Sequence, residues 1–243
     1  MASILDGIAK QKLFIFLIVD VSTSMRGKRI DQVNNAISEI KTYLNDFEGE
    51  NSNVEFYLSI LTFGTNSDWF LDEIAMPLKG LDIKPIKAGG YSNLHLAYNK
   101  LNDILLKESQ GGIMPDFGGV APIMLLLTDG HPTKWPIKDE IEALRKRPWF
   151  KVALRYGIAI ELNDNKTIAV LRDFVQNNGD VIECYNSNLL KKIIKIIVIT
   201  ASKVKSDGSS IHRDNKVSAS RHIQIQVQQA LTEVEDWEWW YGT

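Results

Sequence analysis

Two uninterrupted apolar runs, each followed closely by an aspartate, constrain the fold of this 243-residue chain more than any other feature. Residues 13–19 read LFIFLIV before Asp20, and residues 123–127 read IMLLL before Thr128 and Asp129. Because neither run alternates apolar with polar residues, each is typical of a strand that is buried on both faces. Strands of this kind form parallel sheets that helices cover on both sides. The two runs therefore predict an α/β fold.

Helical and extended patterns alternate along the rest of the chain. Apolar residues recur at helical spacing over 30–47, 94–108, 137–146, 166–176 and 187–203, and extended patterns cover 54–63, 68–73, 151–160 and 180–184. This alternation indicates parallel βαβ units with right-handed crossovers. We therefore predict a doubly wound, mostly parallel central sheet flanked by helices.

The composition changes near the end of the chain, which becomes polar and then acidic and aromatic. We expect one domain over residues 1–204, followed over residues 205–243 by a linker and an acidic, aromatic tail. Trp237, Trp239 and Trp240 are candidate partner-binding residues, because exposed aromatic patches mark interfaces. A tail without a docking role is the alternative, and self-association through the tail is a further hypothesis.

Charge and cysteine content exclude several classes of protein. The 28 basic and 30 acidic residues leave no net positive charge for nucleic acid or a membrane surface. No apolar stretch approaches the about 20 residues that span a bilayer, and no signal peptide is visible. The lone cysteine, Cys184, lies in the apolar context DVIECY and is typical of a core thiol in a reducing compartment. We therefore expect a soluble, cytoplasmic protein that binds neither nucleic acid nor a membrane.

Three polar clusters follow predicted secondary-structure boundaries, at the edge where doubly wound sheets bind ligands. Asp20, Ser22 and Ser24 occupy alternate positions after the first apolar run, so their side chains can point the same way. Ser92 follows a Gly-Gly-Tyr turn, and Asp129 follows the second apolar run. Two carboxylates and three hydroxyls suit Mg²⁺ or Mn²⁺. These five residues predict a metal site that accepts a further carboxylate from a protein partner.

These motifs resemble the von Willebrand factor type A (VWA) family, whose metal-ion-dependent adhesion site (MIDAS) combines a D-x-S-x-S loop with a distant threonine and a distant aspartate. The resemblance covers about residues 13–199 and is nearest to bacterial TerY-type proteins associated with tellurite resistance, through FIFLIVDVSTSMRGKRI, the GG turn and LLLTDGHPT. It implies a Rossmann-like VWA fold and metal-dependent protein binding. It also implies a bacterial stress-response setting, with a kinase or phosphatase encoded nearby as candidate partner.

Some residues depart from the family pattern. Ser92 stands at the threonine position, where it keeps the hydroxyl but lacks the β-branch that stiffens χ1. Tyr91, His95 and His131 neighbour the predicted site, and we expect them to shape its rim and bind the partner. Taken singly, Asp20 and Ser92 are also typical helix-cap residues. The combination of three clusters in the right order favours the metal site.

Two other functions remain open. A phosphoryl-transfer or hydrolytic enzyme of the haloacid dehalogenase type would use Asp20, but it needs a second aspartate where this chain has Ser22. The sequence also lacks a G-x-x-x-x-G-K nucleotide loop. An interaction protein with a vestigial site is the third alternative, and only the serine at position 92 supports it. We expect a metal-dependent adaptor and not an enzyme.

Overall fold

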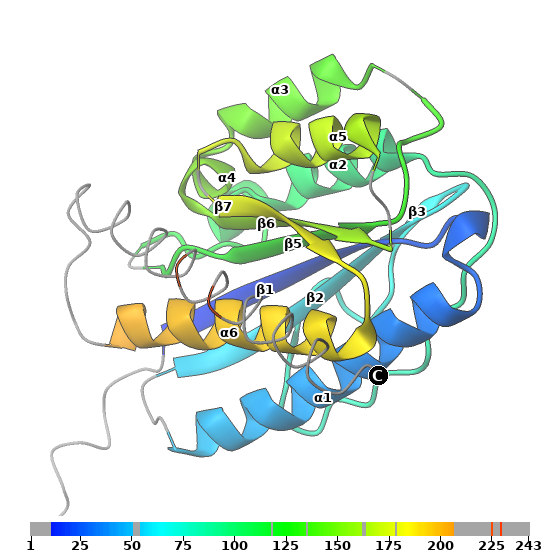
Figure 1. Cartoon of the computed structure of the whole chain (residues 1–243). Coiled ribbons are helices and arrows are strands. Elements are labelled where there is room, and N and C mark those ends of the chain that lie inside the picture. Colours follow the sequence, from blue (N-terminus) through cyan, green and yellow to red (C-terminus); the bar gives the residue numbers. More distant parts are fainter. Residues whose placement is uncertain are drawn as a thin grey trace, which may run out of the picture.

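The computed structural model describes residues 11–50, 54–117, 119–134, 136–161, 164–177, 179–206, 225 and 229. Within these residues, helices cover both faces of a central sheet (Figure 1). The strands are β1 (Gln11–Asp20), β2 (Val54–Phe63), β3 (Ser67–Trp69), β4 (Met76–Pro77), β5 (Ile123–Thr128), β6 (Leu154–Ile160) and β7 (Gly179–Cys184). The helices are α1 (Lys28–Glu50), α2 (Leu94–Ile104), α3 (Lys138–Lys146), α4 (Pro148–Val152), α5 (Asn165–Val175) and α6 (Ser187–Ser206), with 3₁₀ helices η2 (Thr23–Met25) and η3 (Glu108–Gln110).

The sheet has the order β3-β2-β1-β5-β6-β7, and β4 pairs with β2. The central strand β1 is parallel to both of its neighbours, with Ile15 opposite Leu58 in β2 and opposite Ile123 in β5. Strands β6 and β7 continue the parallel array, whereas the short strands β3 and β4 are antiparallel to β2. The chain winds from β1 towards one edge and later from β5 towards the other. This arrangement confirms the doubly wound, mostly parallel sheet and creates a switch point between β1 and β5.

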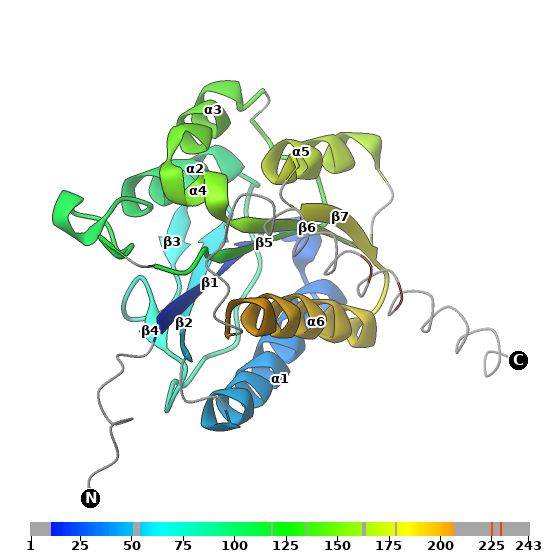
Figure 2. The same ribbon diagram turned by 90° about the vertical axis from the view of Figure 1, so that its left-hand side faces the viewer.

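Two hydrophobic cores lie on the two faces of the sheet. Helices α1 and α6 cover one face, and α2, α3, α4 and α5 cover the other (Figures 1 and 2). Alternate residues of β1 belong to the two cores. Ile15 and Leu17 face α1 and α6, whereas Phe14, Phe16 and Ile18 face the other helices. Because both faces are covered, β1 is buried continuously from Leu13 to its end. The uninterrupted apolar pattern of this strand is thereby explained.

Some element boundaries differ from the sequence-based expectation. The strand predicted over 151–160 begins only at Leu154, because Pro148–Val152 forms helix α4. Proline suits the first turn of a helix, where its missing N–H costs no hydrogen bond. The helix predicted over 94–108 ends at Ile104, and the extended piece after β2 pairs over three residues only.

Helix α6 runs to Ser206 and ends near the amino ends of the parallel strands, away from their carboxyl ends (Figure 1). The predicted domain boundary after residue 204 stays a prediction. Trp237, Trp239 and Trp240 lie outside the described residues. No helix in the described part of the chain has the length and apolar content required to cross a membrane.

Candidate metal site

Strand β1 delivers Asp20 to the carboxyl edge of the sheet, where its side chain is completely buried. The backbone N–H of Ser22 donates to Oδ1 of Asp20 at 2.8 Å, and this contact turns the chain out of the strand. The next residues form the 3₁₀ helix η2, so the alternation of side chains that an extended segment would give does not apply here. The Oγ atoms of Ser22 and Ser24 nevertheless lie 3.0 Å apart. The predicted grouping of these three side chains is therefore present, through a tighter turn.

Ser92 reaches the same place from a segment that is hydrogen-bonded to the loop after β1. The hydroxyl of Ser92 donates to Oδ2 of Asp20 at 3.1 Å, across 72 positions of sequence. Gly90 before it has φ +94°, and a Cβ there would lie 2.2 Å from Oγ1 of Thr65. Only glycine fits at such a position. Asn93, not Ser92, occupies the N-cap position of helix α2, and the hydroxyl of Ser92 is bonded to Asp20 instead.

Asp129 follows β5 directly, and Asp129 is only 3% exposed. The hydroxyl of Ser24 donates to Oδ1 of Asp129 at 2.7 Å, across 105 positions of sequence. The parallel pairing of β1 with β5 explains this contact, because the carboxyl ends of both strands then meet at one edge. All five residues that the sequence indicated are therefore brought together by one continuous set of hydrogen bonds.

Two further residues belong to the site and were missed from the sequence. Thr128, the last residue of β5, donates from Oγ1 to Oδ2 of Asp20 at 2.6 Å. Arg29, in the first turn of α1, donates from Nη1 to Oδ2 of Asp129 at 2.6 Å and to the carbonyl oxygen of Ser24 at 3.0 Å. The position of Thr128 at a strand end was a usable signal. Nothing local in the sequence indicated that Arg29 turns back towards the loop.

Burial raises the pKa of the Asp20 carboxyl above its usual range, and the hydrogen bonds from Thr128 and Ser22 oppose this increase. The negative charge of Asp129 raises the pKa of Asp20 further. Burial and a neighbouring carboxylate both disfavour the ionised form of Asp20, and a cation bound beside Asp20 would stabilise that form. The electrostatics of the site therefore suit a positively charged ligand.

The donor atoms decide which cation fits. The five predicted ligand residues offer carboxylate and hydroxyl oxygens only, which are hard ligands of the kind that Mg²⁺ and Mn²⁺ prefer. Within the described part of the chain, no group of three or more His, Cys, Asp or Glu side chains is placed to hold a metal ion. An ion at this site must therefore take ligands from the serine hydroxyls. The residues present fit such an ion.

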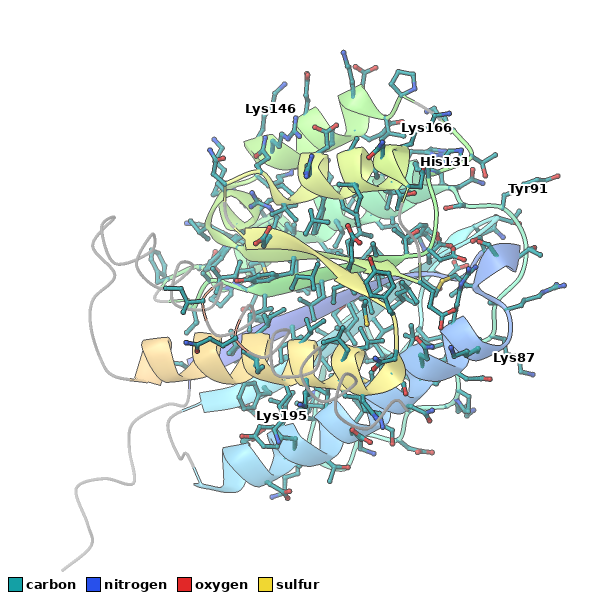
Figure 3. The ribbon with its side chains drawn as sticks, in the orientation of Figure 1. Lys87, Tyr91, His131, Lys146, Lys166 and Lys195 are labelled. Atoms are coloured by element: carbon teal, nitrogen blue, oxygen red, sulfur yellow. The ribbon has the colours of Figure 1, made fainter. Side chains whose placement is uncertain are left out.

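The three predicted rim residues have different environments. Tyr91 is 64% exposed, and Figure 3 shows that it projects from the same end of the molecule as His131, which is also exposed. His95 is half-buried on α2, where burial and the charge of Lys134 lower the pKa of the imidazole. Tyr91 and His131 are therefore accessible to a partner. His95 is less accessible than the sequence suggested, because the helix places it partly inside.

Cys184 lies at the end of β7 and is completely buried. Burial raises the pKa of the Cys184 thiol to about 12. A thiol in this environment stays protonated at neutral pH and is a poor nucleophile. The prediction of a core thiol is in agreement with these observations.

Comparison with known proteins identifies the fold. The family model described as the von Willebrand factor type A domain matches residues 15–197. Inter-alpha-trypsin inhibitor heavy chain H1 from Sus scrofa is 25% identical over 187 residues, which make up 72% of this chain and 19% of that protein. This chain thus spans about a fifth of the length of that curated relative.

Several solved structures share the architecture at lower identity. Proximal thread matrix protein 1 from the mussel byssus, with a zinc occupied MIDAS motif, is 16% identical with a TM-score of 0.55, over 79% of this chain and 48% of that one. The ArnB paralog VWA2 from Sulfolobus acidocaldarius is 18% identical with a TM-score of 0.53, over 76% of this chain and 45% of that one. BatB from Bacteroides thetaiotaomicron is 13% identical with a TM-score of 0.54, over 79% of this chain and 99% of that one.

At these identities the solved structures establish a shared fold. The family model establishes more than a shared fold, because it matches the sequence itself from the first buried strand into helix α6. Since residues 15–197 make up most of the 243-residue chain, this protein belongs to the von Willebrand factor type A domain family.

Proposed function

We propose that this protein is a metal-dependent adaptor that binds a protein partner through Mg²⁺ or Mn²⁺ held by Asp20, Ser22, Ser24, Ser92 and Asp129. The observation that carries the proposal is the convergence of these side chains at the switch point between β1 and β5. When bound, the divalent ion supplies an electrophilic centre for a carboxylate of the partner. The occurrence of a zinc occupied MIDAS motif in a protein of the same fold is consistent with this proposal.

The side chains of the site have distinct tasks in this proposal. Asp20 is held on both carboxylate oxygens, by the N–H of Ser22 on Oδ1 and by the hydroxyls of Ser92 and Thr128 on Oδ2. Its orientation is therefore fixed before an ion arrives. Ser22 and Ser24 supply neutral oxygens, so that the ligand set carries no more than the two negative charges of its aspartates. Preorganisation of this kind lowers the cost of binding.

The surroundings of the site favour an acidic partner. Lys87, Tyr91, His131 and Lys166 lie at the same end of the molecule (Figure 3), and both lysines are exposed. The side chain of Lys28 is also exposed, but its Nζ pairs with Oε1 of Glu161 at 2.8 Å, so its charge is partly neutralised. Positive charges around a binding site steer negatively charged groups towards it. A carboxylate-bearing surface is therefore the partner chemistry that this end of the molecule suits.

An enzymatic role has less support. A nucleophilic aspartate has to reach its substrate, whereas the carboxylate of Asp20 is completely buried and hydrogen-bonded on both oxygens. Ser22 stands where an acid of the phosphatase type would be needed, and its hydroxyl lies against that of Ser24. We therefore propose a binding function without catalytic turnover.

The biological setting is also part of the proposal. The resemblance to TerY-type proteins supports a bacterial stress response, with a kinase or phosphatase as the acidic partner. The single buried cysteine supports a cytoplasmic location. The tail that contains Trp237, Trp239 and Trp240 is proposed to dock on a partner or on the metal site of a second copy. Light scattering on the full chain and on a chain that ends at Ser206, each in Mg²⁺ and in EDTA, separates these two roles.

Calorimetric titration with Mg²⁺ and Mn²⁺ tests the metal site. We expect the wild type to bind about one ion, and Asp20→Asn to lose about 100-fold or more in affinity, because half of the carboxylate charge is removed. Asp103→Asn is the matched control, since Asp103 is exposed on α2 away from the site. Equal titration of the two variants, or no uptake by the wild type, contradicts the proposed function.

A further inference from the structure

Arg29 brings a positive charge into direct contact with the predicted metal ligands. Its Nη1 atom lies 2.6 Å from Oδ2 of Asp129, whose side chain is 0% exposed, while the Arg29 side chain itself is 30% exposed. The same Nη1 atom donates to the carbonyl oxygen of Ser24. The guanidinium group therefore lies on the side of the site that is formed by Asp129 and Ser24.

The position of Arg29 in the fold is unfavourable for helix stability. Lys28 and Arg29 are the first two residues of α1, and the N-terminus of a helix carries a partial positive charge that disfavours cations. The ion pairs of Arg29 with Asp129 and of Lys28 with Glu161 oppose this unfavourable effect. A divalent ion bound to Asp129 would weaken the ion pair between Arg29 and Asp129, because the two cations compete for the same carboxylate.

A second position for the guanidinium group is built into the neighbouring structure. Nε of Arg29 lies 3.6 Å from Oε2 of Glu161, which follows β6 at the same edge of the sheet. Gln32, one helical turn after Arg29, donates from Nε2 to Oε1 of Glu161 at 2.7 Å. Gln32 is only 3% exposed, and its Oε1 atom has no hydrogen-bond partner among the described residues. Oε1 of Glu161 also pairs with Nζ of Lys28 at 2.8 Å, so the oxygen of Glu161 that faces Arg29 is Oε2. This oxygen and the buried amide oxygen of Gln32 lie beside Arg29.

We propose that Arg29 is a tethered counter-cation of the metal site, which pairs with Asp129 when no ion is present and moves to Glu161 and Gln32 when an ion binds. The role rests on the proposed metal site. In this arrangement Arg29 stabilises the ion-free protein by neutralising a buried carboxylate. It also lowers the affinity for the ion, because its interaction with Asp129 has to be broken first. Arg29 therefore sets the threshold concentration of metal at which the site becomes able to bind a partner.

Arg29→Gln and Arg26→Gln form a matched pair of variants. Both remove one positive charge from the same segment, but Arg26 is exposed and its Nε donates to the carbonyl oxygen of Ala88. We expect Arg29→Gln to bind Mg²⁺ and Mn²⁺ about 10-fold more tightly than the wild type, because the competing charge is gone. Arg26→Gln should stay within about 3-fold of the wild type, as expected for a charge screened by solvent. Calorimetry measures both.

A double-mutant cycle tests the second position. Glu161→Gln should weaken metal binding in the wild-type background, because Arg29 then lacks its alternative carboxylate. In the Arg29→Gln background the same substitution should have little effect, since residue 161 then has no guanidinium group to pair with. Equal effects in both backgrounds would mean that Glu161 acts only as a distant negative charge. This result overturns the proposal that Arg29 moves from Asp129 to Glu161.

A spectroscopic measurement on the wild type keeps the test independent of variant folding. The Nε–H resonance of Arg29, assigned by its absence in Arg29→Lys, should shift on addition of Mg²⁺, while that of Arg26 should move less. If the wild type binds the ion but the Arg29 resonance does not respond, or if folded Arg29→Gln binds no more tightly, the proposed role of Arg29 is overturned while the metal site stands. Absence of binding in every variant overturns the metal site itself.

Discussion

Two buried charged groups at opposite ends of the sheet are satisfied in different ways. Arg155, near the start of β6, is 2% exposed and donates to the backbone carbonyl oxygens of Phe150, Phe174 and Val175. Its guanidinium group also lies 4.3 Å from the centre of the Phe150 ring. Asp20, at the carboxyl end of β1, accepts hydrogen bonds from a backbone N–H and from two hydroxyls.

The difference between these partners separates a structural charge from a functional one. Backbone carbonyls at the ends of α4 and α5 cannot turn away from Arg155 without unwinding the helices. The hydroxyls of Ser92 and Thr128 can rotate. The oxygen of Ser92 has lone pairs that can bind a cation, whereas that of Thr128 also accepts from the N–H of Gly130 at 3.2 Å. A buried charge with fixed partners therefore stabilises the fold, whereas one with rotatable partners is ready to exchange them for a ligand.

The largest effect that we expect is a loss of stability when Arg155, the structural charge, is replaced. Arg155→Ala removes the guanidinium donor from three carbonyl oxygens, of which that of Phe150 keeps the N–H of Ala153 at 3.3 Å. It should lower the free energy of unfolding by about 3 kcal/mol or more. Urea denaturation measures the loss. The folded fraction should keep the wild-type affinity for Mg²⁺, because Arg155 and the metal ligands lie at opposite ends of the sheet. A loss of metal affinity that exceeds the loss of folded protein would break the proposed separation.

A smaller effect is expected for Thr128→Val, which preserves the shape of the side chain but removes its hydroxyl. Oδ2 of Asp20 then loses its 2.6 Å donor, and metal affinity should fall about 10-fold, as is typical for groups that orient a metal ligand. Thr62→Val is the matched control, because Thr62 on β2 donates to the carbonyl oxygen of Asp68 outside the site. Equal metal affinities for the two variants would show that Thr128 serves stability alone.

The smallest effect concerns Ser92→Thr, which introduces the residue typical of the family at this position. The β-branch restricts χ1, so the hydroxyl should stay aimed at Asp20 more of the time and metal affinity should rise about 3-fold. Calorimetry under the conditions used for the other variants checks this value. A large increase would support the vestigial alternative for the natural site, and a decrease would show that the surrounding side chains fit only serine.

The local part of the site could be predicted from the sequence, and its surroundings could not. Asp20, Ser22 and Ser24 share a short segment, and Asp129 ends an apolar run, so their placement follows from strand geometry. The hydroxyl of Ser92 was recognised from a glycine turn. Arg29 was missed because its contact with Asp129 spans 100 positions of sequence and depends on the direction in which α1 leaves the loop.

The same distinction explains the errors in element boundaries. The run before Ile160 contains Lys151, Val152 and Ala153 and was assigned to a strand, whereas in the structure Lys151 and Val152 belong to helix α4, which begins at Pro148. Arg155 stabilises the result, since its donors reach carbonyl oxygens at the ends of both α4 and α5. A buried arginine that joins two helix ends is a tertiary feature. Its consequences for local structure are not visible in the local pattern.

The sequence by itself determined the α/β class, the buried central strands and the chemistry of the five candidate ligands, because burial period and residue type are local properties. The tertiary structure decided which oxygens meet. The register that sets Ile15 of β1 opposite Ile123 of β5 brings Asp20 and Asp129 to one edge, and it places Thr128 and Arg29 against them. Those contacts join segments about a hundred residues apart, and their energies depend on burial and distance, which exist only after the sheet has formed.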